Sequence, residues 1–139
     1  MAFDFGLRRI GLAVGDTLTR TARPYSALLV GAAGLLEQDW RRLESTVVKS
    51  GARQLVVGCP YNVDGSSSVM TEQARRFAQT LATRCGLPVH LVDERYSSLE
   101  AEAALREQRR AGERRRYDKP AIDSAAATIV LERWLAGER

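Results

Sequence analysis

The chain has 139 residues, 45% of them hydrophobic and 27% charged, and a formal net charge of +4. This is the length of one globular domain, so we expect a single domain over residues 1–139 rather than a disordered chain. No apolar run approaches the roughly 20 residues that cross a bilayer, and charges interrupt the first apolar stretch, so a cytoplasmic protein without a membrane segment or signal peptide is expected. Two cysteines without a CxxC motif and one histidine exclude a zinc finger or ribbon.

The first third of the chain predicts three strands and a helix. Residues 1–6 and 9–16 are short apolar runs separated by a turn, which is typical of a hairpin. Residues 21–30 predict a third strand, which Pro24 confines to an edge of the sheet. Residues 35–50 have apolar side chains at helical spacing and end before Gly51, a frequent helix stop.

The rest of the chain alternates strands with helices. Residues 54–58 predict a buried central strand, 59–68 a polar loop, 69–84 a helix and 88–92 a second buried strand. A further helix is expected from Ser97 or Ser98 to about 110, then a basic connection over 109–119, then a last helix that opens at Pro120 or Ala121. This order predicts an α/β fold with a mixed five-stranded sheet, antiparallel at its start and then parallel, with helices on its faces.

Carboxylates recur at key positions of these elements. Asp4 interrupts the first strand, Asp93 and Glu94 end the strand at 88–92, and Asp123 lies in the first turn of the predicted last helix. Each alone is explained by an ion pair or by the helix dipole. Together they are hard oxygen ligands suited to Mg²⁺ or Mn²⁺, and two such ions support phosphodiester hydrolysis. Because neighbouring strand residues face opposite ways, only one of Asp93 and Glu94 should reach the cluster; the sequence leaves open which.

The basic residues indicate a polyanionic partner. Segment 106–119 carries seven basic and three acidic residues, which is the pattern of a nucleic-acid binder or, equally, of a solvated segment. The loop at 59–68 offers polar donors for phosphates and a tyrosine that could stack on a base. The residues that we expect to contact nucleic acid are Tyr61, Asn62, Arg95, Arg109, Arg110, Arg114, Arg115 and Arg116.

Four motifs in this order resemble the YqgF/RuvX family of Holliday junction resolvase-like proteins, also described as pre-16S rRNA nucleases. They are Asp4-Phe-Gly with Ile10-Gly-Leu-Ala-Val-Gly-Asp16, Val57-Gly-Cys-Pro-Tyr-Asn-Val-Asp-Gly65, Val92-Asp-Glu-Arg-Tyr-Ser97 and Ile122-Asp-Ser-Ala-Ala126. The resemblance implies a ribonuclease H-like fold. It also implies that Asp4, the Asp93-Glu94 pair and Asp123 are the family's acids. Related resolvases carry a further acid one helical turn beyond the last, where this chain has Ala126 and Ala127.

These observations lead to one expected function and two alternatives. The expected function is a nuclease of the two-metal-ion type that trims the 5′ end of precursor 16S rRNA, as a monomer or weak homodimer. One alternative is a resolvase that acts on branched DNA. The other is a nucleic-acid-binding factor in transcription or ribosome assembly that does not cleave, which the missing further acid favours.

Overall fold

One five-stranded sheet organises the protein. The computed structural model describes residues 1–94 and 124–137. The strand order is β3-β2-β1-β4-β5, with β1–β2 and β2–β3 antiparallel and β1–β4 and β4–β5 parallel. The strands are β1 (Ala2–Phe5), β2 (Arg9–Asp16), β3 (Thr21–Leu29), β4 (Leu55–Cys59) and β5 (Val89–Asp93). The helices are α1 (Glu37–Ser50), α2 (Val69–Cys85) and α5 (Ala125–Leu135).

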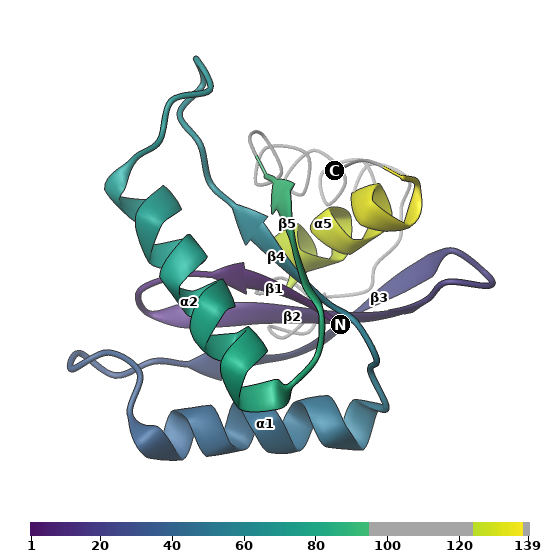
Figure 1. Ribbon diagram of the computed structural model, residues 1–139, viewed down its shortest axis with the longest axis horizontal. Helices are drawn as coiled ribbons and strands as arrows, with labels where there is room; N and C mark the ends of the chain where they lie inside the picture. The colour runs from purple at the N-terminus through teal and green to yellow at the C-terminus, as the bar shows by residue number, and fades with distance from the viewer. Residues whose placement is uncertain (95–123, 138–139) are drawn as a thin grey trace, which may run out of the picture.

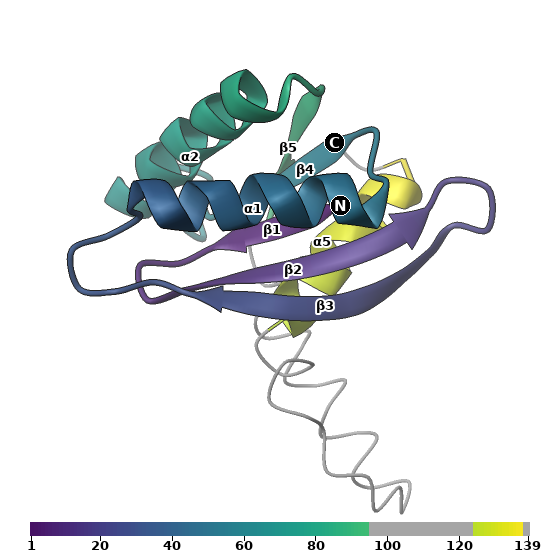
Figure 2. The ribbon, with the colours of Figure 1, turned by 90° about the horizontal axis from the view of Figure 1, so that it is seen from below.

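Helices cover both faces of the sheet: α1 and α2 lie on one and α5 on the other (Figures 1 and 2). Alternation along the strands produces two separate cores, because successive side chains point to opposite faces. Phe3 and Val57 pack under α1 and α2, whereas Ala2 and Val56 pack against α5. Any polar side chain in phase with Ala2 and Val56 therefore points toward α5.

The predicted mixed sheet is confirmed, and the seven elements expected before residue 94 are present with ends shifted by at most two residues. The strand at 88–92 was expected to be buried, but β5 is an edge strand in which only Val92 is buried. The helix expected from 35 begins at Glu37, because the Leu36 nitrogen donates to the carboxylate of Asp39 at the N-cap (2.9 Å). Within the described residues, no helix has the length and apolar character needed to cross a membrane.

The predicted start of the last helix is wrong: α5 begins at Ala125, four or five residues later than expected. The reason is tertiary. The Ser124 hydroxyl donates to the Tyr25 carbonyl (2.6 Å) and accepts from the Leu12 nitrogen (3.3 Å), which ties the N-cap residue to β2 and β3. The helix expected from Ser97 or Ser98 to about 110 and the basic connection at 109–119 lie outside the described residues.

Candidate active site

Two carboxyl groups that are 90 positions apart in the sequence meet on the α5 face of the sheet. Asp4 pairs with Gly58 across β1 and β4, and Gly58 pairs with Val92 across β4 and β5. Glu94 follows Val92 at strand spacing and continues the ladder by donating its backbone N–H to the Cys59 carbonyl (3.1 Å). Its side chain is buried and hydrogen-bonded to that of Asp4.

Gly58 makes this meeting possible because it is the strand residue between the two acids. A Cβ atom at position 58 would lie 2.5 Å from Oε2 and 2.9 Å from Cδ of Glu94, and 3.0 Å from Cγ2 of Val130 on α5. Real Cβ atoms essentially never come within 3.0 Å of such a neighbour. Because Gly58 has no side chain, the Glu94 side chain can lie over its backbone and reach Asp4.

Burial raises the proton affinity of both acids, and Asp4 raises that of Glu94 further. Burial raises the pKa of Asp4, while the hydrogen bond from Glu94 and the charge of Arg9 act in the opposite direction. Burial, together with the neighbouring Asp4 charge and hydrogen bond, raises the pKa of Glu94 to about 10, although Arg133 on α5 lowers it. Near neutral pH the pair therefore retains a proton between its two carboxyl groups, as expected for like charges in a desolvated site.

Because side chains alternate along β5, Glu94 and Asp93 point to opposite faces of the sheet. Asp93 pairs with Cys59 at the last rung of the sheet and lines a cavity together with Tyr61 and Leu91. Its backbone carbonyl accepts a hydrogen bond from Nη1 of Arg133 (3.2 Å). Of the two adjacent acids, Glu94 is the one hydrogen-bonded to Asp4, while Asp93 is half-buried in the wall of the cavity that Tyr61 and Leu91 also line.

The carboxyl pair has the donor chemistry that a divalent cation requires. Asp4 and Glu94 offer converging hard oxygen atoms in a buried site, the ligand type that Mg²⁺ and Mn²⁺ prefer. Within residues 1–94 and 124–137, no three Asp, Glu, His or Cys side chains gather closely enough to hold a metal ion. The described pair is thus compatible with part of a coordination sphere. Asp123, the fourth predicted acid, lies outside the described residues.

The predicted nucleic-acid contacts are placed only for the loop after β4. The Tyr61 hydroxyl accepts a hydrogen bond from Nη2 of Arg75 (3.1 Å). The Asn62 amide donates to the Ser66 hydroxyl (3.0 Å), so this side chain helps to close the loop itself. The six predicted arginines, Arg95, Arg109, Arg110, Arg114, Arg115 and Arg116, lie outside the described residues.

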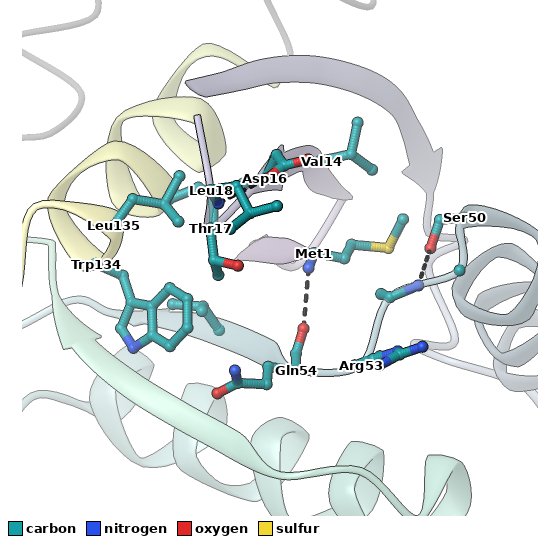
Figure 3. A pocket seen from close by; sticks show the side chains of 15 residues that line it. Met1, Val14, Asp16, Thr17, Leu18, Ser50, Arg53, Gln54, Trp134 and Leu135 are labelled. Carbon is teal, nitrogen blue, oxygen red and sulfur yellow. Dashed lines mark hydrogen bonds between the residues drawn. The ribbon is translucent and has the colours of Figure 1, made fainter. Parts of the chain in front are cut away.

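A cavity of about 380 Å³ lies at the opposite end of the sheet (Figure 3). It is bounded by the start of β1, the end of β2, the turn before β4 and the end of α5, with Met1, Leu18, Gln54 and Trp134 on its walls. Its carboxylate, Asp16, accepts hydrogen bonds from the Leu18 and Thr19 nitrogens (2.6 and 3.3 Å), as in a turn. This cavity is thus separate from the acid pair, which lies at the carboxyl ends of the parallel strands, where α/β proteins usually bind ligands.

Comparison with known proteins assigns the family. A family model described as "RuvX: Holliday junction resolvase" matches residues 1–137. The chain belongs to this family. The resemblance seen in the four sequence motifs is thereby confirmed.

Curated RuvX relatives match the chain along nearly all of its length. A protein of Coxiella burnetii (strain CbuK_Q154), named "Putative pre-16S rRNA nuclease", is 42% identical over 139 residues, which are 100% of this chain and 93% of the relative. A protein of the same name from Legionella pneumophila (strain Philadelphia 1) is 43% identical over 135 residues, 97% of this chain and 93% of the relative.

Solved structures place the fold. Thermus thermophilus RuvC in complex with a Holliday junction substrate superposes with a TM-score of 0.59 at 15% identity, covering 97% of this chain and 92% of that one. A second structure of RuvC from T. thermophilus gives a TM-score of 0.52 at 14% identity with the same coverage. The expected ribonuclease H-like fold is confirmed.

Two site residues are not singled out by the sequence. Gly58 lies at the end of a predicted buried strand, and a glycine inside a strand often marks a close approach of another group. Arg133 belongs to none of the four sequence motifs. The packing of α5 against β5 brings its guanidinium group to the Asp93 carbonyl and near Glu94. A glycine close to a strand end could have been flagged from sequence, whereas the arginine could not.

Proposed function

We propose that the protein is a divalent-metal-dependent nuclease that hydrolyses phosphodiester bonds and processes the 5′ end of precursor 16S rRNA in the cytoplasm. The observation that carries the proposal is the pairing of the buried Glu94 with the half-buried Asp4 at the carboxyl ends of β5 and β1. Two carboxyl groups held together away from solvent are costly to a fold and therefore indicate a functional site. The RNA substrate is carried over from the names of the relatives.

The cation would be held by Asp4 and Glu94, together with Asp123, whereas the Asp93 side chain lies on the other face of the sheet. When bound, Mg²⁺ or Mn²⁺ supplies Lewis-acid stabilisation of phosphate oxygens and a more acidic water. The protein's own part is to hold the two carboxyl groups in one geometry across Gly58 and to give up the shared proton before a cation enters. Arg133 fixes the end of β5 from α5 through the Asp93 carbonyl.

The test compares substrates and variants. Purified protein with Mg²⁺ or Mn²⁺ should cleave an RNA that spans the 5′ end of 16S rRNA, and Asp4→Asn and Glu94→Gln should each abolish cleavage. Retained RNA binding by these inactive variants would show that cleavage alone was lost. If neither variant affects cleavage by the purified protein, the site is wrong.

A second candidate is a resolvase acting on branched DNA. The family description and the superposition on a RuvC–junction complex favour it. Resolution of a four-way junction needs two active sites and therefore a stable dimer. The oligomeric state that we expect for this protein is a monomer or weak homodimer. Preferential cleavage of four-way DNA over precursor rRNA, together with a dimer in solution, would select this alternative. A protein that binds either substrate but cleaves neither would be the non-cleaving factor.

A further inference from the structure

A second cavity lies at the carboxyl ends of β4 and β5. Its volume is about 300 Å³, and its walls are formed by Cys59, Tyr61, Gly65, Leu91, Val92 and Asp93. Cys59 and Asp93 form the last rung of the sheet, one residue beyond Gly58 and Val92. The side chains of Cys59, Leu91 and Asp93 are in phase with Val57, so the cavity lies on the α2 face of the sheet, and the backbone of β4 and β5 separates it from Asp4 and Glu94 on the α5 face.

The aromatic wall of the cavity is fixed in place from the α2 side. Nη2 of Arg75 donates to the Tyr61 hydroxyl (3.1 Å), and its guanidinium carbon lies 5.6 Å from the centroid of the ring. Arg75 is in turn paired with Glu72 one helical turn earlier (2.6 Å). Since the ring is oriented before a ligand arrives, little side-chain freedom would be lost on binding.

The loop that carries Tyr61 is also braced at both ends. The buried Thr71 hydroxyl donates to the Pro60 carbonyl, while the Ser68 hydroxyl caps α2 by accepting from the Thr71 nitrogen (3.2 Å). At the tip, the Asn62 carbonyl accepts from the Gly65 nitrogen (2.8 Å) and the Asn62 nitrogen donates to the Ser66 carbonyl (2.9 Å). The cavity is thus preformed by backbone and side-chain hydrogen bonds.

The chemistry of the walls selects a flat, uncharged ligand. Tyr61 offers an aromatic ring, and Leu91 is an aliphatic side chain with 42% of its surface exposed. Cys59 is almost fully buried and contributes a small apolar side chain to the cavity wall. The Asp93 carboxylate disfavours a phosphate and favours a group with N–H donors. Nucleobases combine an aromatic face with N–H donors on one edge.

We propose that this cavity binds one unstacked base of the substrate strand. Tyr61 stacks on the base, Leu91 covers its edge, and Arg75 is the positioning residue for Tyr61. A base within a duplex cannot enter, so the substrate is single-stranded at this nucleotide. That the bound strand is a substrate rests on the proposed nuclease function, but the binding of the base does not.

The test measures binding without cleavage. A single-stranded oligoribonucleotide containing 2-aminopurine is titrated with the protein in EDTA, beside an abasic oligonucleotide of equal length and charge. We expect 2-aminopurine fluorescence to be quenched on binding. Tyr61→Leu should bind the base-containing strand about tenfold more weakly, which corresponds to about 1.4 kcal/mol, and bind the abasic strand as the wild type does. Val63→Ala, in the same loop but outside the cavity wall, is the matched control.

Two further variants separate stacking from loop damage. Tyr61→Phe keeps the ring and should retain at least half of the wild-type affinity, whereas Arg75→Gln should weaken binding of the base-containing strand only. Equal losses for both oligonucleotides, or no loss for either, would overturn the proposal. If base-dependent binding is found but no RNA is cleaved with Mn²⁺, the nuclease proposal fails and the base site stands. Cleavage without base-dependent binding would support the nuclease proposal and overturn the base site.

Discussion

Replacing Gly58 with alanine tests whether the acid pair depends on the bare backbone between its members. The added Cβ would lie 2.5 Å from Oε2 of Glu94, whereas ordinary contact begins at 3.4 Å, so the carboxylate must retreat by about 0.9 Å. Cγ2 of Val130 on α5 is 3.0 Å from the same Cβ position, so the new methyl group cannot be accommodated by a shift toward α5. The substitution should therefore move Glu94 away from Asp4 rather than be absorbed elsewhere.

The magnitude of the effect follows from this displacement. Overpacking of this kind costs about 1–3 kcal/mol of stability, and a misplacement near 1 Å in an active site lowers the rate by roughly 10²-fold. We expect Gly58→Ala to remain folded, to cleave RNA about 100-fold more slowly and to bind Mn²⁺ more weakly by calorimetry. Gly31→Ala, where an added Cβ meets nothing within 4 Å, is the control and should match the wild type. Wild-type cleavage and Mn²⁺ affinity in Gly58→Ala would refute the reasoning.

Three other predictions address the charges and the loop. Folded Glu94 keeps its proton up to about pH 10 whereas the unfolded chain releases it near 4.5, so unfolding free energy should fall with rising pH in this window by up to about 1.4 kcal/mol per unit. Glu94→Gln should flatten this slope in denaturation curves at pH 6–9 and abolish thermal stabilisation by Mn²⁺; an unchanged slope would contradict the burial argument. Arg133→Gln should raise the pKa of Glu94 further and shift Mn²⁺ binding to higher pH, whereas Arg133→Lys should not; equal titration curves for both would refute it. Thr71→Val removes the hydrogen bond to the Pro60 carbonyl and should lower the free energy of unfolding by about 1–3 kcal/mol in urea titrations. Thr71→Ser keeps the hydroxyl donor and should retain most of the wild-type stability.

The sheet could be predicted from sequence because its signals are local. The continuous apolar run at 54–58 marks a strand buried on both faces, whereas the similar run at 88–92 forms the edge strand β5, in which only Val92 is buried. Gly51 and Gly86 stop the preceding helices in left-handed conformations. The end of a helix depends on its own residues in these cases. The start of α5 does not, since Ser124 is held by β2 and β3, more than 95 positions away, and no local pattern at 120–124 encodes that.

The candidate site was predictable only up to a choice between two neighbours. Alternation along a strand implied that Asp93 and Glu94 would face opposite ways, but the direction of each depends on the register of β5 against β4. That register is fixed by pairs such as Val57 with Leu91, which involve two segments more than 30 positions apart. With the register known, Glu94 falls on the face of α5 and meets Asp4.

A buried acid pair is a physical argument about function because the fold gains nothing from it. The core on the α5 side of the sheet consists of apolar side chains such as Ala2, Val56 and Val130, so apolar residues of similar volume would be better tolerated there than Asp4 and Glu94. The carboxyl groups share a proton because burial penalises their charge, and anything that neutralises that charge stabilises the folded protein. A divalent cation would be such a group, since it would replace the proton and keep both carboxylates ionised. The unfavourable burial of the two carboxyl groups would therefore favour cation binding. Gly58 maintains this arrangement because it has no side chain between the two acids.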